Sequence, residues 1–381
     1  MLFQRLRSAT LFFALVAGLA ASACREAPPV LKVACQGDTS FIRAVNCARD
    51  SIERSGSPVK VDLVFDNAPR WSPAEVIVCT DAFCREPGLM AVIGFTSSDA
   101  SLASARMLNR HEIVQIVPTA TSPKLDDTGP WTFRLCPGDE YQAEVLASTA
   151  LETLGAGRCA LLYQNNDYGR ELATLFRRGY EDLGGVISFA AQLGSGFDDP
   201  TNLDLYVRQV IESAPDLLVL VCQPEQAEVV QQELLRRGST LPLLGSDSLG
   251  THSALLKRIH LFEGMYVLLF YHHDFAFPGN ADFVDCFRSN RGGVPGYEAA
   301  LAHDALLLLH QAVLEGARTS EDIRDWLAAL VDRPPIIGVA GPIRFHRGRQ
   351  AWRPLHLAEI RNGEVHLVSD ADQLIEEPNV R

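Results

Sequence analysis

Leu217-Leu-Val-Leu-Val-Cys222 is apolar at every position, and an amphipathic helical pattern over residues 224–238 follows it. Residues 242–245 then read as another short strand. Strands that are apolar throughout and are separated by amphipathic helices are typical of parallel sheets covered on both faces. This part of the chain therefore predicts an α/β fold.

The same alternation of strand and helix runs through most of the chain. Two sets of strands predict two doubly wound parallel-sheet lobes. Two later helices and several short strands are too few for a third lobe, so we expect them to complete the first two. The predicted strands lie at 30–34, 59–65, 89–95 and 113–118, and then at 159–163, 185–193, 217–222 and 242–245.

The domain boundaries follow from this division. Lobe 1 is predicted to comprise residues 31–138 plus 266–340, and lobe 2 residues 139–265 plus 341–381. The chain would then cross between the lobes several times, which predicts a hinge made of several connections.

Composition excludes several classes of protein. The chain has 381 residues, of which 47% are hydrophobic and 21% are charged, as in ordinary globular domains. The formal net charge of −13 argues against binding to nucleic acid or to an anionic membrane surface. The length fits two domains.

The N-terminus has the pattern of a signal peptide. Arg5 and Arg7 precede an apolar run over 9–21, and the small residues Ala21-Ser22-Ala23 precede Cys24. We expect export, with residues 1–23 removed and residues 24–30 forming a tether. Small residues before a cysteine resemble the bacterial lipobox, so Cys24 is a candidate for lipidation. The alternative is ordinary cleavage that leaves Cys24 as a free thiol.

An exported protein can form disulfides, and eight cysteines remain besides Cys24. Cys79 and Cys84 lie five residues apart in a predicted helix, which places them on different faces, so we expect no bridge between them. Cys159 and Cys222 belong to strand-like runs and are expected to be small buried hydrophobic residues. The pairing of the others stays open.

No enzymatic motif stands in the context that its chemistry needs. Gly155-Ala-Gly-Arg-Cys-Ala160 fits the loose dinucleotide fingerprint, but a helix precedes it and a strand follows, which is the reverse order. Two adjacent residues on a strand point to opposite faces, so His272-His273-Asp274 is not expected to hold a metal. His303-Asp304 lies on an apolar helix and is expected in the core. We predict no catalytic site, no cofactor and no metal.

Three stretches carry a family resemblance. They are Ala91-Val-Ile-Gly-Phe-Thr-Ser-Ser98 with Ile116-Val-Pro-Thr-Ala-Thr-Ser-Pro123, Leu161-Leu-Tyr-Gln-Asn-Asn-Asp-Tyr-Gly169, and Pro215-Asp-Leu-Leu-Val-Leu-Val221 with Leu244-Gly-Ser-Asp247. In order and spacing they resemble the branched-chain amino-acid (Leu/Ile/Val) binding family of periplasmic solute-binding proteins, which have the type I periplasmic binding fold. The resemblance spans about residues 31–368.

The resemblance implies a binding site for an amino acid or a similar small molecule between the lobes, and an ABC permease as partner. An α-amino acid is a zwitterion, so its site needs hydrogen-bond donors at one end and a carboxylate at the other. By similarity, Ser98, Thr121 and the backbone near Thr119 hold the ligand carboxylate, Asp247 receives the ammonium, Tyr168 closes over the ligand, Tyr297 lies against its side chain, and Thr96, Ser97 and Gln223 line the walls.

Each of the main residues also has a purely structural interpretation. Ser98 can be a helix N-cap, Asp247 an Asx-turn residue, Thr121 a turn residue and Tyr168 a packing residue between the lobes. At the level of function, the alternative to transport is an envelope sensor or regulatory lipoprotein that uses the same fold.

The segment Cys35-Gln-Gly-Asp-Thr-Ser-Phe41 departs from the family. It is shorter by about six residues than the loop that, by the resemblance, forms a wall near the ligand side chain. Aliphatic specificity depends on an apolar enclosure. We therefore expect leucine, isoleucine and valine to bind weakly and a larger or more polar ligand to bind best, unless Tyr297 or Phe95 fills the gap.

Overall fold

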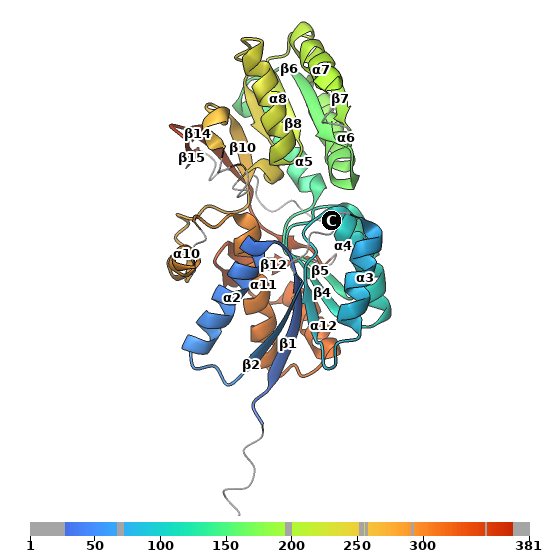
Figure 1. Ribbon diagram of the computed structural model, residues 1–381, viewed down its shortest axis with the longest axis vertical. Helices are drawn as coiled ribbons and strands as arrows, with labels where there is room; N and C mark the ends of the chain where they lie inside the picture. The colour runs from blue at the N-terminus through green and yellow to red at the C-terminus, as the bar shows by residue number, and fades with distance from the viewer. Residues whose placement is uncertain are drawn as a thin grey trace, which may run out of the picture.

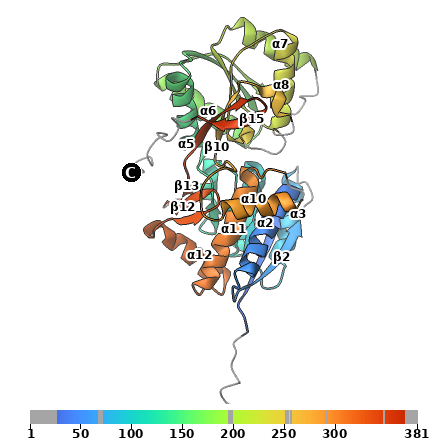
Figure 2. The same cartoon turned by 90° about the vertical axis from the view of Figure 1, so that its left-hand side faces the viewer.

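The computed structural model describes residues 27–66, 72–194, 200–250, 255, 258–290, 293–346 and 349–368. The predicted signal peptide and Cys24 lie outside these residues. The chain forms two lobes, one above the other along the long axis (Figures 1 and 2). Among the described residues, no helix is long and apolar enough to cross a membrane.

Lobe 1 is built on a parallel sheet of five strands in the order β2-β1-β3-β4-β5. Residues along β1 alternate between two cores: Leu31 and Val33 face one, and Ala34 faces the other. The sheet is therefore covered on both faces, as its apolar strands predicted. The strands are β1 (Val30–Gln36), β2 (Lys60–Asp66), β3 (Ala91–Ile93), β4 (Val114–Val117) and β5 (Thr132–Arg134); the helices are α2 (Thr39–Arg54), α3 (Pro73–Cys84), α4 (Ser98–Arg110), α10 (Asn280–Ser289), α11 (Tyr297–Leu314) and α12 (Ser320–Ala328).

Lobe 2 is built on a sheet of seven strands in the order β15-β14-β10-β9-β8-β6-β7. Its five strands from β10 to β7 are parallel, whereas β14 and β15 are antiparallel and extend one edge. Helices α5 and α6 pack together, as do α7 and α8. The strands are β6 (Arg158–Gln164), β7 (Val186–Leu193), β8 (Leu217–Val221), β9 (Leu243–Gly245), β10 (Tyr266–Leu269), β14 (His356–Arg361) and β15 (Glu364–Leu367); the helices are α5 (Asp139–Ser148), α6 (Asp167–Asp182), α7 (Pro200–Glu212) and α8 (Pro224–Arg236).

The two-lobed α/β fold with parallel sheets is confirmed, but the crossing points differ from the predicted ones. Tyr266 pairs with Leu244 in the second sheet, so the chain returns to lobe 1 only after β10 and not at residue 266. The strands β12 (Gly341–Phe345) and β13 (Ala351–Trp352) lie beside β5, so the chain rejoins lobe 2 near β14 and not at 341. Local pattern predicts a strand but does not say which sheet edge it joins.

A buried ion pair connects the crossing segments. Asp304 in α11 accepts hydrogen bonds from the backbone amide of Val339 at 2.7 Å and from the Arg353 guanidinium at 3.0 Å. Arg353 also donates to the Leu135 carbonyl at 2.9 Å. Both charged side chains are fully buried. Leu135 and Arg353 belong to two connections between the lobes, so this ion pair holds them to lobe 1.

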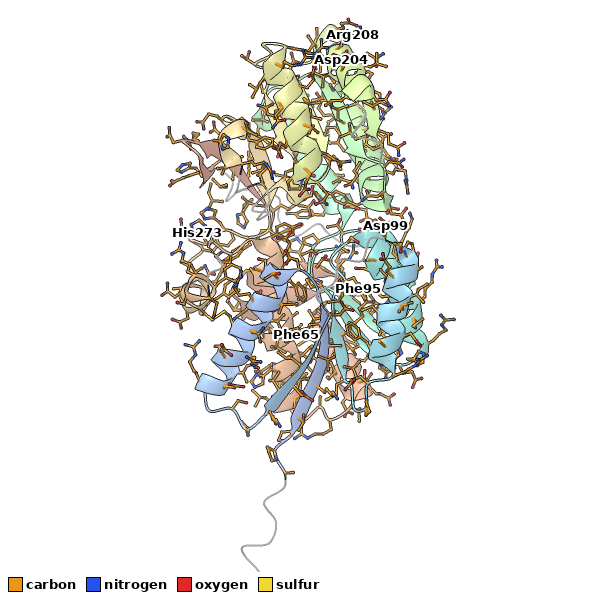
Figure 3. The ribbon with its side chains drawn as sticks, viewed as in Figure 1. Phe65, Phe95, Asp99, Asp204, Arg208 and His273 are labelled. Carbon is orange, nitrogen blue, oxygen red and sulfur yellow. A yellow bond between two sulfur atoms is a disulfide. The ribbon has the colours of Figure 1, made fainter. Side chains whose placement is uncertain are left out.

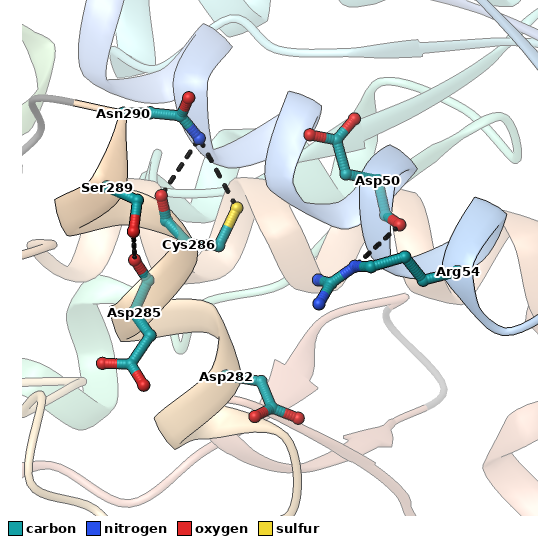
Figure 4. A pocket seen from close by; sticks show the side chains of 7 residues that line it. All are labelled: Asp50, Arg54, Asp282, Asp285, Cys286, Ser289 and Asn290. Carbon is teal, nitrogen blue, oxygen red and sulfur yellow. Dashed lines mark hydrogen bonds between the residues drawn. The ribbon is translucent and has the colours of Figure 1, made fainter.

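The disulfide Cys47–Cys286 joins α2 to α10, across 239 residues of sequence. Sequence reasoning left this pairing open, because its partners are brought together only by the packing of α10 on α2. Asn290 donates to the Cys286 carbonyl at 3.0 Å beside the bridge. Figure 4 shows the open surface hollow of 470 Å³ next to it, lined by Asp50, Arg54, Asp282, Asp285, Cys286, Ser289 and Asn290.

The other cysteine predictions hold among the described residues. Cys79 and Cys84 are not bridged to each other. Cys159 and Cys222 are fully buried thiols.

Removing the disulfide should destabilise the protein substantially. A bridge that closes a long loop restricts the unfolded chain, so we expect Cys47→Ser together with Cys286→Ser to lower the free energy of unfolding by about 2–4 kcal/mol. Urea unfolding followed by circular dichroism measures this change. Cys84→Ser, at a half-buried free cysteine, is the matched control and should leave the midpoint nearly unchanged. Equal midpoints for the double variant and the control would contradict a formed bridge.

Candidate functional site

The centre of the candidate site is a buried tyrosine–aspartate pair in lobe 2. The phenol of Tyr168 donates to Asp247 Oδ1 at 2.6 Å. The hydroxyls of Ser246 and Ser248 lie 2.8 and 3.1 Å from the same phenol oxygen. The backbone amide of Asp247 donates to Gln142 Oε1 in α5 at 2.9 Å. Two residues predicted to meet the ligand from lobe 2 are thus brought together.

Local structure explains why these two side chains meet. Asp247 follows β9, and Tyr168 lies in the first turn of α6, which follows β6. The carboxyl ends of parallel strands meet at one edge of the sheet, where ligands of such folds bind. Asn166 caps α6 by accepting from the Gly169 amide at 2.8 Å, which orients its first turn.

Burial changes the charge state of Asp247. Its side chain is almost completely buried, and removal from water raises the pKa of its carboxyl from 3.8 to about 6, although hydrogen bonds from Tyr168 and Gln142 partly oppose this. A buried carboxylate of this kind is stabilised when a cation binds beside it. An Asx-turn residue needs neither this burial nor a hydrogen bond from Tyr168, so a turn role alone does not explain the position of Asp247.

Sequence reasoning missed a second acid, Asp139, at the start of α5. It is fully buried, and neither carboxylate oxygen has a hydrogen-bond partner of good geometry among the described residues. Burial raises its pKa well above the usual range; the adjacent Thr121 hydroxyl lowers it in part, and the charge of Asp247 raises it further. The sequence feature that could have identified Asp139 is its position directly after Gly138, where the first connection between the lobes ends.

The lobe 1 side of the site contains Thr121. Its side chain is buried, and its hydroxyl has no hydrogen-bond partner of good geometry. Its backbone carbonyl accepts from the Asp139 amide at 3.0 Å, which places lobe 1 directly against the crossing segment. Thr121, Asp139, Asp247 and Tyr168 therefore form one group of neighbours drawn from both lobes.

Of the residues with hydroxyl groups near α4, some hold the local backbone in place and others are free to contact a ligand. Thr119 donates to the Thr96 carbonyl at 2.8 Å and so ties together the loops after β3 and β4. Ser97, and not Ser98, is the N-cap of α4: its side chain accepts from the Ala100 amide at 3.4 Å. Ser98 is buried in the first turn, where free backbone amides favour an anion. The N-cap interpretation of Ser98 is therefore wrong.

The remaining predicted residues differ in position. Tyr297 begins α11 and is buried; burial and the neighbouring acids Glu298 and Asp247 raise its pKa well above the usual range, so it borders the group. Phe95 is buried in the core of lobe 1 with α3 and α4, so it does not fill the gap left by the short first loop. Gln223 stands half-buried at the start of α8, and no described contact joins it to Asp247.

The short first loop is confirmed. Only Gly37 and Asp38 separate β1 from α2. Asp38 caps the helix by accepting from the Phe41 amide at 2.8 Å. A side chain at Gly37 would overlap the ring of Phe41, so the chain turns directly from strand into helix here.

Polar contacts join the two lobes beside the site. Ser122, after β4, donates to Glu171 of α6 at 2.7 Å, and Lys124 lies 3.2 Å from the same carboxylate. Asp99 in α4 lies near Asp167 of α6: burial raises the pKa of the Asp99 carboxyl, and the charge of Asp167 raises it further. Figure 3 shows Asp99 on the side of lobe 1 that faces lobe 2. The lobes are thus in contact along the α4–α6 edge.

Comparison with known proteins agrees with this architecture. The family model described as "Periplasmic binding protein" matches residues 36–364. The branched-chain amino-acid substrate-binding protein LivJ of Streptococcus pneumoniae, solved with isoleucine, superposes with a TM-score of 0.79 at 20% identity, covering 89% of this chain and 99% of that one.

Two curated relatives show how broadly the sequence similarity extends. Leu/Ile/Val-binding protein homolog 1 of Brucella abortus is 26% identical over 150 residues, 39% of this chain and 38% of that protein. Metabotropic glutamate receptor 8 of Homo sapiens is 23% identical over 230 residues, 58% of this chain. The matched region spans only 25% of the length of this receptor and 21% of the G-protein coupled receptor family C group 6 member A of Carassius auratus.

Proposed function

Since the chain belongs to the periplasmic binding protein family, we propose that it binds a small solute carrying an amino group between its two lobes. The family resemblance and the fold support a binding protein of the envelope. The single observation that carries the proposal is the pair of buried acids, Asp139 and Asp247, beside Tyr168.

Two buried carboxyl groups are costly for the ligand-free protein: burial raises the pKa of both, and the charge of Asp247 raises that of Asp139 further. A cation placed between them removes this cost, because opposite charges at short distance favour the ionised forms. An ammonium group also donates three hydrogen bonds, and Asp139 has two oxygens without partners of good geometry. The acids therefore favour a ligand with a primary amine.

The α4 side of the site suits an anion. Ser98 offers a hydroxyl group, and the first turn of α4 offers backbone amides. Thr121, which the family resemblance also assigns to the ligand carboxylate, lies beside Asp139. A ligand with both an ammonium and a carboxylate would join the two lobes. An amino acid meets this requirement, which supports the role implied by the family resemblance.

Binding between two lobes implies a hinge mechanism. A ligand that contacts both lobes stabilises the closed arrangement over the open one. We propose that an ABC permease recognises the closed form and that Ser122, Lys124 and Glu171 add polar contacts to it. Export to the cell envelope, with Cys24 as a candidate lipid anchor, completes this proposal.

A sensor role is the second candidate. It is supported by the match of part of the chain to proteins that are named as receptors. Stimulation of ATP hydrolysis by a reconstituted cognate permease would support transport. Ligand-dependent capture of another envelope protein, without such stimulation, would support sensing.

A ligand screen tests the proposed function. We expect polar or cationic amino acids to raise the thermal midpoint most and leucine, isoleucine and valine to raise it little, because the first loop leaves one wall open and two acids line the site. A ligand present at 100 times its Kd should add about 2.7 kcal/mol to the free energy of unfolding. Calorimetric titration of the best ligands then gives the affinities.

The outcomes separate the class of ligand from its side chain. If no compound with a primary amine shifts the midpoint, the amine-binding proposal fails. Leucine binding with a Kd below 1 µM corresponds to a binding free energy of roughly −8 kcal/mol or better. If leucine binds this tightly and no polar amino acid competes with it, only the inference about the ligand side chain fails.

A further inference from the structure

The turn after β10 brings together three metal-ligating side chains, His272, His273 and Asp274. The sequence predicted no metal here because adjacent residues on a strand point to opposite faces. However, β10 ends at Leu269, and residues 273 and 274 form a turn. One ligand atom from each residue lies within 4.8 Å of the other two.

The spacing of these atoms suits a shared ion better than hydrogen bonds. His273 Nε2 lies 3.5 Å from Asp274 Oδ1, and His272 Nδ1 lies 3.8 Å from Asp274 Oδ2. Hydrogen bonds of this type are about 2.7–3.2 Å long. Two ligands that each lie about 2.0–2.2 Å from a tetrahedral Zn²⁺ are about 3.3–3.6 Å apart. Small rotations would therefore bring all three onto one ion.

The hydrogen bonds of His272 fix the tautomer of its ring. Its Nε2 lies 3.2 Å from the Val365 carbonyl, which can only accept, so Nε2 carries the hydrogen. Its Nδ1 is therefore unprotonated and accepts a long hydrogen bond of 3.3 Å from the Asp274 amide, which a metal ion would replace. Metal-binding histidines commonly donate their other ring N–H to a backbone carbonyl in this way.

Hydrogen bonds from Asn280 hold the backbone of the turn in place. Asn280, at the start of α10, donates to the His273 carbonyl at 2.9 Å and to the Phe275 carbonyl at 2.7 Å. Its own side-chain oxygen accepts from the Tyr271 hydroxyl at 2.8 Å. Asn280 is 1% exposed, whereas the Asp274 side chain is 75% exposed. The cluster is thus preorganised and open to solvent at the same time.

We propose that His272, His273 and Asp274 bind one divalent transition-metal ion of the Zn²⁺ type, with a solvent molecule at the remaining position. Two imidazoles and one carboxylate are a donor set that Zn²⁺ accepts readily. Figure 3 shows His273 at the edge of the molecule, where the lobes meet. The turn belongs to the connection between β10 and α10, and His272 bonds to Val365 in β15, so the ion would tie this connection to lobe 2.

Calorimetric titration of the tag-free full chain with Zn²⁺ at neutral pH tests this site. We expect one ion per chain. Asp274→Asn and His273→Ala should each weaken the affinity at least about tenfold, because each removes one of three ligands. His111→Ala, at an exposed histidine after α4, is the matched control and should bind Zn²⁺ as the original chain does.

The proposal is overturned if the chain binds no Zn²⁺ stoichiometrically, or if Asp274→Asn and His273→Ala bind it as tightly as the control. Circular dichroism verifies that each variant is folded. Because the Asp274 side chain is mostly exposed, Asp274→Asn decides the question even if His273→Ala does not fold.

Discussion

Replacing Asp247 by alanine should weaken binding of the amine ligand by roughly 150- to 4,000-fold. The ligand ammonium would lose its buried partner, and breaking a buried ion pair costs about 3–5 kcal/mol. The Tyr168 phenol would also lose an acceptor at 2.6 Å. Calorimetric titration with the best ligand from the screen measures the loss. Asp182→Asn, at an exposed position of α6, is the control and should bind normally.

The pH dependence provides an independent check on Asp247. Its pKa in the ligand-free protein is raised to about 6, and an ammonium binds the ionised carboxylate. The protonation of Asp247 should therefore lower the affinity of the original chain by up to about tenfold per pH unit below pH 6. Asp247→Asn should lose most of this dependence. If folded Asp247→Ala binds the ligand with unchanged affinity, Asp247 does not contact the ammonium and is only a turn residue.

Replacing Asp304 by alanine should destabilise the fold by about 3–5 kcal/mol, because it leaves the buried Arg353 without its partner. The Val339 amide would also lose its acceptor. Chemical unfolding measures the change in the free energy of unfolding. Asp325→Ala, at an exposed position of α12, is the control and should change it by less than about 0.5 kcal/mol.

Acid unfolding should show the same interaction. Burial alone would raise the pKa of Asp304, but His303, Arg353 and the Val339 amide lower it below its ordinary value. The folded pKa thus lies below the unfolded one, so the stabilisation is present above about pH 4 and is lost as the pH falls through the folded pKa. Asp304→Asn should lack this part of the acid transition. An identical acid profile in that variant would contradict the ion pair.

Much of the fold could be predicted from local pattern. Runs such as Leu217–Val221 are apolar on both faces, which is possible only for a strand buried between two layers of helices. Periodic helices between such strands then require a parallel sheet. The family resemblance predicts Asp247 and Tyr168 as site residues. Both follow strand ends, and parallel strands end at one edge, which is consistent with that prediction.

The sequence by itself determined the class of fold and the two lobes, because these depend on periodicity, whereas Asp247 and Tyr168 are site residues by the family resemblance. Only the tertiary structure decided the Cys47–Cys286 bridge, the approach of Asp139 to Asp247, the Asp304–Arg353 pair and the convergence of His272 with Asp274. The first three join segments far apart in the chain, and the last depends on the residue at which a strand ends. None of these four features can be predicted from the local hydrophobic pattern, because each depends on how the sheets and connections pack.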